Sequence, residues 1–233
     1  MNEHISPPSP LLRLLEGRAG LEAAQLMLQL PILRFHAKRG NGEPVLVLPG
    51  FMADDNSTII LRQYLNSIGY IARGWGLGTN AQRMMDHQPG VLAAVREMQD
   101  EYQQKVRLVG WSRGGILSRE IARDYPELIE RVITIGSPVK GGAGASSIGR
   151  MVTRQTGLTS SEMNQILHVR QRNPITVPIR SIYSRLDGVV AWRACIDETS
   201  PDVQHFETRG THIAMGASVE VFRLLPKLLH SEH

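Results

Sequence analysis

A serine between two glycines is the residue of this sequence with the clearest chemical meaning. Ser112 is the centre of the pentapeptide 110–114, Gly-Trp-Ser-Arg-Gly, which follows an apolar run at 106–109 and precedes a helical segment at 114–124. A serine hydroxyl is a weak nucleophile, so it needs a turn that lifts it clear of the fold to where a base can take its proton. Gly-x-Ser-x-Gly between a strand and a helix makes such a turn. The pattern predicts a nucleophilic serine at position 112.

An acid and a base follow the serine in the order that this chemistry uses. Asp187 lies just past an apolar run at 179–183, and His212 lies between the last expected strand and the last expected helix. Each of these residues would come from a loop after a later strand, as the order Ser, acid, His requires. We therefore predict Ser112 as the nucleophile, His212 as the base and Asp187 as the acid that orients it.

Other carboxylates and histidines fit these roles less well. Asp202 begins an expected strand, and Asp197 lies farther from a strand end than Asp187 does. The other seven histidines are terminal, precede the nucleophile, or lie in a strand or in the segment 140–178: His4, His36, His87, His168, His205, His230 and His233. A lone histidine is usually structural, so it is position in the chain that favours His212.

Backbone donors are expected to meet the negative charge of a tetrahedral intermediate. The N–H of Arg113, directly after the nucleophile, would be one donor. The second would come from the loop at 48–52, Leu-Pro-Gly-Phe-Met, with the N–H of Phe51 as first choice and that of Met52 as second. Phe51, Met52 and Trp111 would also add apolar surface to the substrate site.

Strand and helix signals alternate along most of the chain, which positions these residues. Apolar runs predict strands at 45–48, 70–74, 106–110, 132–135, 179–183 and 202–207. Helices are expected at 11–30, 56–67, 90–104, 114–124, 161–169 and 217–229. Repeated strand–helix units predict an α/β fold with a mostly parallel sheet and helices on both faces. In such sheets, ligands bind at the carboxyl ends of the strands, so the candidate residues would share one edge.

Two segments interrupt this alternation. Residues 140–178 are rich in Gly, Ser, Thr and Gln, and we expect a cap or lid above the sheet. Its apolar residues would either line a substrate pocket or form a small core: Ile148, Met151, Val152, Leu158, Met163, Ile166 and Leu167. Residues 1–38 hold a Pro-rich leader, expected to be disordered, and an amphipathic helix that covers the sheet or contacts a membrane or partner. The main domain is expected at 39–233.

The quoted motifs resemble the lipase and esterase branch of the α/β-hydrolase superfamily. The likeness rests on the segments 49–51, 110–114, 184–190 and 210–215, and it covers the chain from about residue 45 to its end. Many lipases of this superfamily have His-Gly where this chain has Pro49 and Gly50. The resemblance implies an acyl-enzyme mechanism with Ser112, His212 and Asp187, no cofactor, and an ester with an apolar acyl chain as substrate. A thioesterase or an acyltransferase would use the same residues.

Composition narrows the remaining function classes. The chain has 233 residues with 26 basic and 22 acidic side chains, a net charge of +4, and its arginines are scattered, so we read them as a solvated surface and expect no nucleic-acid partner. Contact with an anionic membrane surface stays an alternative. Cys195 is the single cysteine, so no internal disulfide forms, and no metal site is expected. With no secretory signal and no transmembrane stretch recognised, a cytoplasmic protein is the default.

Two hypotheses from other classes stay open at this point. The segment 76–81, Gly-Leu-Gly-Thr-Asn-Ala, fits the Gly-x-Gly-x-x-Gly/Ala fingerprint of dinucleotide-binding oxidoreductases, although no clear helix follows until about Gly90. A non-catalytic binding module could keep the fold with a decayed site. The Gly-rich run 141–147 lacks the Lys of a P-loop, and Asp54 and Asp55 are expected to favour the start of a helix.

Overall fold

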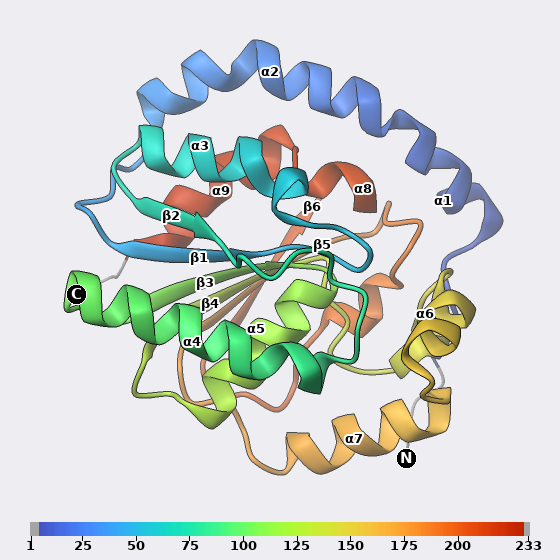
Figure 1. Cartoon of the computed structure of the whole chain (residues 1–233). Coiled ribbons are helices and arrows are strands. Elements are labelled where there is room, and N and C mark those ends of the chain that lie inside the picture. The colour runs from blue at the N-terminus through green and yellow to red at the C-terminus, as the bar shows by residue number, and fades with distance from the viewer. Residues whose placement is uncertain (1–4, 231–233) are drawn as a thin grey trace.

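A six-stranded sheet runs through the centre of the computed structural model, which describes residues 5–230 (Figure 1). Its strands are β1 (Pro44–Leu48), β2 (Ile71–Gly74), β3 (Val106–Trp111), β4 (Ile129–Ile135), β5 (Ile179–Ser184) and β6 (Val203–Thr208). They lie in the order β2-β1-β3-β4-β5-β6, and every neighbouring pair is parallel. The predicted parallel α/β sheet is confirmed.

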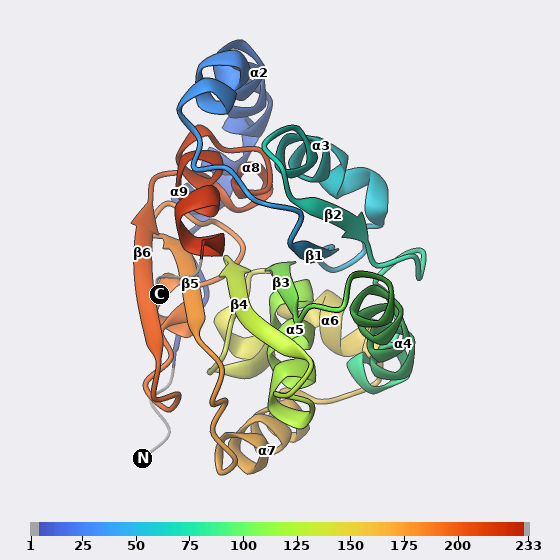
Figure 2. The same cartoon turned by 90° about the vertical axis from the view of Figure 1, so that its left-hand side faces the viewer.

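Two helical layers cover the sheet, one on each face (Figure 2). Helices α3 (Ile59–Ser67) and α9 (Val219–Leu229) pack on one face, with α2 (Ala19–His36) lying over them, and α4 (Met84–Tyr102) and α5 (Arg113–Asp124) pack on the other. Successive side chains of a strand point to opposite faces. In β1, Val45 and Val47 join the first core, whereas Leu46 and Leu48 join the second. A strand covered on both faces must therefore be apolar throughout.

The segments outside the alternation also have regular structure. The N-terminal strap, our name for residues 10–36, consists of α1 (Pro10–Leu15), the 3-10 turn η1 (Glu16–Arg18) and α2. Residues 140–178, which we name the cap segment after the sequence prediction, hold η3 (Gly142–Ala145), α6 (Gly149–Thr156) and α7 (Ser160–Gln171). The remaining elements are η2 (Asp55–Thr58), η4 (Trp192–Cys195) and α8 (His212–Met215).

The leader and the strap differ from their sequence predictions. Residues 1–4 of the leader lie outside the described residues, whereas Ile5 is buried in a small cluster with Ala145 and Val190. In α2, the polar stripe does not simply face solvent, because Glu22 accepts a hydrogen bond from the N–H of Thr211. Leu26, Leu30 and Leu33 pack on the sheet side of α2, while a second set of apolar residues is exposed on the far side.

Several helix boundaries were wrong in detail. Helix α4 begins at Met84 and contains Pro89, so it starts six residues before the predicted Gly90. Helix α6 was not predicted, because its sequence lacks a long apolar run. Asp54 accepts the N–H of Asn56 and caps η2, but the carboxylate of Asp55 instead accepts the N–H groups of Trp75 and Gly76, both at 3.0 Å.

The scattered charges predicted that the arginines lie on a solvated surface, but some of them are buried. Five are buried: Arg107, Arg113, Arg119, Arg123 and Arg131. Nη2 of Arg119 lies 2.8 Å from Oδ2 of Asp197, and both side chains are nearly inaccessible. Nη1 of Arg131 donates to the carbonyl of Leu228 at the end of α9. These arginines therefore connect elements inside the fold.

Candidate active site

Ser112 lies on a sharp turn between β3 and α5. Its φ of 53° and ψ of −120° are rarely adopted by residues other than glycine, so the surrounding structure must hold this conformation. A Cβ added at Gly110 would lie 2.3 Å from the Cα of Gly115, and one added at Gly114 would lie 2.4 Å from the carbonyl oxygen of Leu48. The two glycines of the motif are therefore required by the close approach of strand, loop and helix.

His212 and Asp187 lie beside this turn. His212 begins α8, and its Nε2 is 3.0 Å from Oγ of Ser112. Its Nδ1 is 2.6 Å from Oδ2 of Asp187, in the turn after β5. The other carboxylate oxygen of Asp187 accepts the N–H groups of Val189 at 2.8 Å and Val190 at 2.6 Å, which fixes the orientation of the carboxylate. The structure brings the three residues together as one chain of hydrogen bonds.

The charge around His212 decides its protonation behaviour. The imidazole is buried, and burial disfavours its charged form. The Asp187 carboxylate outweighs this effect by its charge and its hydrogen bond, and Glu16 adds to it, so the pKa of His212 is raised above its usual value. A proton on Nε2 is therefore stabilised at this position.

The loop after β1 passes directly over the serine. A Cβ added at Gly50 would lie 3.5 Å from Cβ of Ser112. The N–H of Met52, the second choice for an oxyanion donor, donates to the carbonyl of Asn80 at 3.0 Å. The N–H of Phe51 remains the candidate in this loop. The N–H of Arg113 belongs to the first turn of α5, where helical N–H groups have no partner within the helix.

Asn80 braces this loop, a role that sequence reasoning missed. Its side-chain Nδ2 donates to the carbonyl of Pro49 at 2.9 Å, and its backbone N–H donates to that of Ala53 at 2.8 Å. Gly76 and Gly78 have φ values of 73° and 72°, and the next helix starts only at Met84. The segment 76–81 therefore supports the loop over the serine and does not form the strand–turn–helix of a dinucleotide site.

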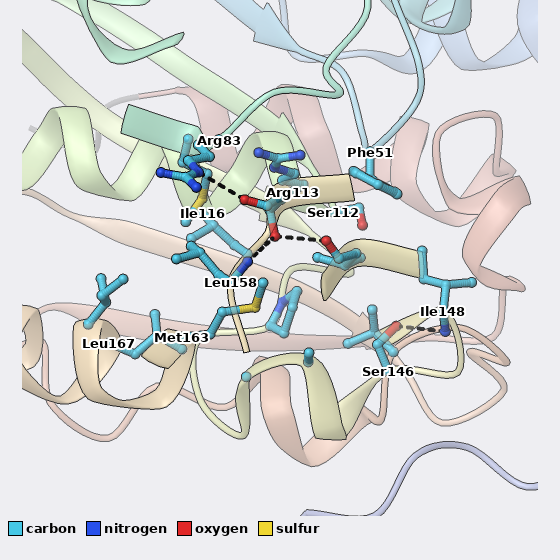
Figure 3. Close-up of a pocket in the computed structure, with 18 of the residues that line it drawn as sticks. Phe51, Arg83, Ser112, Arg113, Ile116, Ser146, Ile148, Leu158, Met163 and Leu167 are labelled. Carbon is cyan, nitrogen blue, oxygen red and sulfur yellow. Dashed lines mark hydrogen bonds between the residues drawn. The ribbon is translucent and has the colours of Figure 1, made fainter. Parts of the chain in front are cut away.

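An apolar pocket extends from Ser112 towards the cap segment (Figure 3). Phe51 and Ser112 lie toward one end, and Leu167 of α7 lies toward the other. The pocket is lined by Phe51, Arg83, Met84, Ser112, Arg113, Ile116, Pro138, Gly142, Ala143, Ser146, Ile148, Val152, Thr156, Leu158, Met163, Ile166, Leu167, Val189 and Val190. Six of the seven apolar cap residues considered from the sequence face it, and Met151 does not.

Met52 and Trp111 were expected at the substrate site, but neither lines this pocket. Met52 has a φ of 58°, and its side chain is 52% exposed to solvent. Trp111 points to the side of the sheet where α8 lies, because its indole Nε1 donates to the carbonyl of His212 at 3.2 Å. Trp111 therefore supports the histidine from behind, and Ile116, one turn into α5, supplies the apolar surface near the serine.

The Arg113 side chain borders the pocket without making it polar. Its guanidinium lies over the ring of Phe51, with Cζ 5.3 Å from the ring centroid, and Nη2 donates to the carbonyl of Gln82. Burial lowers the pKa of Arg113 to about 10, so it stays charged at neutral pH. Within residues 5–230, no three His, Cys, Asp or Glu side chains gather as a metal site would require.

Comparisons with known proteins place the fold. The mature lipase BlEst2 of Bacillus licheniformis superposes with a TM-score of 0.65 at 16% identity, covering 83% of this chain and 94% of that one. A monoacylglycerol lipase of Paleococcus ferrophilus superposes with a TM-score of 0.60 at 16% identity, covering 82% and 97%. Together with the parallel sheet and the serine turn, these superpositions decide the fold. This chain has the α/β-hydrolase fold.

Sequence similarity within this α/β-hydrolase fold is local. A triacylglycerol lipase of Pseudarthrobacter phenanthrenivorans is 38% identical over 66 residues, which are 28% of this chain. The matched region spans 21% of that lipase. No protein-family model matches the sequence.

The rival carboxylates have other partners in this α/β-hydrolase fold. Asp197 pairs with buried Arg119, and its Oδ1 also accepts the N–H of Thr199 at 2.8 Å. Oδ1 of Asp202 lies 2.8 Å from Nη1 of Arg180 at the start of β5. No helix within residues 5–230 is both long and apolar enough to cross a bilayer.

Proposed function

We propose that this protein is a serine hydrolase that cleaves carboxylic esters. The observation that carries the proposal is the hydrogen-bonded chain from Oγ of Ser112 through His212 to Asp187, at a strained turn that opens on an apolar pocket. The lipases with the same fold and the local similarity to a triacylglycerol lipase agree with it.

The reaction follows from the roles of these groups. Nε2 of His212 takes the proton of the Ser112 hydroxyl as Oγ attacks the acyl carbonyl, and Asp187 stabilises the imidazolium. The N–H groups of Phe51 and Arg113 receive the oxyanion. His212 then protonates the leaving alcohol, and the acyl group stays on Ser112 as an ester. A water molecule, deprotonated by the same histidine, attacks this ester and releases the acid and the free serine.

The pocket favours an apolar acyl chain as substrate. Its walls away from Ser112 are mostly aliphatic, and an acyl chain that enters it removes apolar surface from water on both sides. We propose that residues 140–178 act as a cap that supplies one wall of this pocket. Binding energy from the chain would then hold the carbonyl at the serine.

Labelling with a fluorophosphonate probe tests the nucleophile. The folded protein should react at Ser112, and Ser112→Ala should abolish both labelling and ester hydrolysis. The absence of labelling in the folded parent would contradict the proposal and favour a non-catalytic binding module. Ester hydrolysis by Ser112→Ala at a rate within a few fold of the parent would show that the nucleophile is wrong.

A substrate panel tests the ester. Hydrolysis rates for p-nitrophenyl esters from acetate to palmitate should be measured beside those for acyl-CoA thioesters of the same chain lengths. We expect ester hydrolysis with a preference for chains longer than acetate. Turnover of thioesters with no ester hydrolysis would assign the same residues to a thioesterase, and product transferred to an added alcohol in place of water would assign them to an acyltransferase.

A further inference from the structure

A single carboxylate of the N-terminal strap binds both loops that carry the histidine and the acid. Oε1 of Glu16 accepts the N–H of Gly188 at 2.7 Å and the N–H of His212 at 2.9 Å. Oε2 accepts the N–H of Ile213 at 2.9 Å. These three donors come from two loops that lie more than 170 residues away from Glu16 in the sequence.

The position of these donors relates Glu16 to the reacting groups. Gly188 directly follows Asp187, and His212 and Ile213 begin α8. The first N–H groups of a helix have no partner within it, and Thr211, the residue before α8, makes no side-chain cap. Glu16 therefore caps α8 from outside. Charge-assisted hydrogen bonds of this type are stronger than those between neutral groups.

Backbone packing shows that the strap is seated tightly on the acid loop. A Cβ added at Gly188 would lie 2.3 Å from the carbonyl oxygen of Leu12, so this contact needs a glycine. Nearby, Glu22 of α2 accepts the N–H of Thr211 at 3.2 Å. The turn η1, between α1 and α2, lies against α8.

We propose that Glu16 is a positioning residue for the hydrolase reaction. It holds the Asp187 and His212 loops at a fixed position relative to each other, so that the imidazole reaches Ser112. This inference rests on the proposed function. Asp187 and Glu16 are the charged groups that act on His212, from the loop after β5 and from η1, while Trp111 of β3 and Thr211 are neutral neighbours. The Glu16 carboxylate would therefore also stabilise the imidazolium formed during the reaction.

The test is Glu16→Gln with Glu127→Gln, an exposed glutamate between α5 and β4, as its matched control. The amide keeps the shape, but its nitrogen cannot accept, so at least one loop N–H loses its acceptor. We expect kcat to fall about tenfold with little change in KM, because a hydrogen bond to a charged group is lost at the histidine. The acidic limb of kcat/KM should also move to lower pH. Glu127→Gln should leave kcat and the limb near those of the parent.

The position of the acidic limb separates positioning from a merely structural role. A smaller folded fraction scales the whole pH profile without moving its limb. NMR titration of the His212 imidazole gives a second readout that needs no turnover. A lower His212 pKa in Glu16→Gln supports the role of Glu16. Failure of the parent to label with fluorophosphonate would contradict the proposed hydrolase activity and would leave this result for Glu16 in place. An unchanged His212 pKa together with kcat within twofold of the parent would overturn it.

A second, independent inference concerns the exposed apolar side chains on the outer face of α2 in the strap. Leu21, Leu28, Ile32 and Phe35 follow one another at spacings of seven, four and three, so they share one face of α2. All four are exposed, with Leu28 at 81% and Phe35 at 83%. This face is roughly opposite the buried Leu26, Leu30 and Leu33. A contiguous exposed apolar face of this kind marks a binding surface.

The charges of the segment that carries this face indicate what covers it. Residues 5–39 contain two acidic side chains, Glu16 and Glu22, and both bind the loops of the active site. The five cations of the same segment are exposed: Arg13, Arg18, Arg34, Lys38 and Arg39. We infer that the face docks on an anionic lipid surface, with apolar side chains in the acyl boundary and cations at the head groups. A twofold dimer would instead bring the same cations together.

Cosedimentation with vesicles tests the docking surface. The protein should bind phosphatidylcholine vesicles that contain 30% phosphatidylglycerol, and should bind pure phosphatidylcholine vesicles and high-salt samples more weakly. The double variant L28S/F35S should lose binding while Ser112 still labels, and Met85→Ser, an exposed methionine on α4, should bind as the parent does. No binding to the anionic vesicles would overturn the inference. A dimer in solution that L28S/F35S dissociates would overturn it in favour of a second copy.

Discussion

The strap and the cap segment both border the Ser112 site, but they contact it in different ways. The strap reaches the loops behind the nucleophile with carboxylates that accept backbone N–H groups, as Glu16 does for Gly188 and His212. The cap reaches the other side with apolar side chains, and Leu158 and Met163 are among those that line the pocket. One segment hydrogen-bonds the polar half of the proposed site, and the other lines its apolar half.

This difference suggests a division of labour in the proposed reaction. Hydrogen bonds are directional, so a segment that works through them controls where His212 and Asp187 point. Apolar contacts depend on area and shape, so a segment that works through them controls which acyl chain fits. Changes on the polar side should act on kcat for every ester alike. Changes on the cap side should act on kcat/KM according to chain length.

The largest expected effect lies on the polar side, at Asp187. In Asp187→Asn, the side-chain oxygen can still accept the N–H groups of Val189 and Val190, and the amide nitrogen then faces Nδ1 of His212. Nδ1 must accept from it, so Nε2 carries the proton and cannot take one from Ser112. We expect kcat to fall about 10³- to 10⁴-fold for all esters, with little loss of stability, measured by steady-state kinetics and thermal unfolding.

Asp197→Asn is the matched control for this variant. Although burial disfavours its charge, Arg119 holds the pKa of Asp197 well below its usual range, and the pair lies away from the serine. Leaving Arg119 buried without its partner should cost about 3–5 kcal/mol of unfolding free energy, measured by urea denaturation. The rate per labelled Ser112 should stay near that of the parent. A large loss of this rate, with Asp187→Asn still active, would reverse the assignment of the acid.

The next effect lies on the cap side. Met163→Trp adds volume to the pocket from α7, so long acyl chains should no longer fit. We expect kcat/KM for palmitate esters to fall about 100-fold, because the lost chain contacts are worth a few methylene groups, and that for acetate to change within a few fold. Val169→Trp changes an exposed residue of the same helix and should leave both values unchanged. An equal loss of kcat/KM for esters of all chain lengths would contradict the proposal that the cap side controls which acyl chain fits.

The polar half of the site could be predicted from sequence to a greater extent than the apolar half. Strand–turn–helix order led to Ser112, Asp187 and His212, which the structure brings within hydrogen-bonding distance. This works because parallel strands deliver their following loops to one edge, so chain order carries spatial information. Trp111 shows the limit of this reasoning. The face of the sheet to which a strand side chain points depends on its position along the strand, and not on its closeness in sequence to Ser112.

A helix over residues 11–30 was predicted, but the contacts of Glu16 within the strap were beyond sequence reasoning for a related reason. Glu16 lies in a short segment with no motif, and its partners are backbone N–H groups, which every sequence has. Asn80 has the same character, since it binds backbone carbonyl groups in the neighbouring loop. The scarcity of acidic residues between positions 5 and 39, where Glu16 and Glu22 are the two present, is the signal that could have drawn attention to Glu16.

A smaller effect concerns pH on the polar side. Burial alone would lower the pKa of His212, but Asp187 and Glu16 outweigh it and raise this pKa. The neutral imidazole that acts as the base therefore forms at a higher pH than in an ordinary histidine. We expect kcat/KM for a neutral ester to have its acidic limb above pH 6.5, falling about tenfold per pH unit below it. The profile should be the same for acetate and palmitate esters. A limb that shifts with chain length would mean that the cap influences His212.

The smallest expected effect lies where the cap meets the main domain. Nε of Arg83, at the start of α4, donates to the carbonyl of Thr156 at the end of α6 with a distance of 2.9 Å. Arg83→Ala should raise KM for long-chain esters a few fold and leave kcat for acetate unchanged, since the one charged hydrogen bond that is lost joins α4 to α6 and does not involve Ser112, His212 or Asp187. Faster hydrogen exchange confined to α6 should accompany it, and exposed Arg154→Ala should show neither change. If Arg83→Ala lowered kcat for all esters instead, the cap would also act on the polar half of the site, and the contrast with the strap would fail.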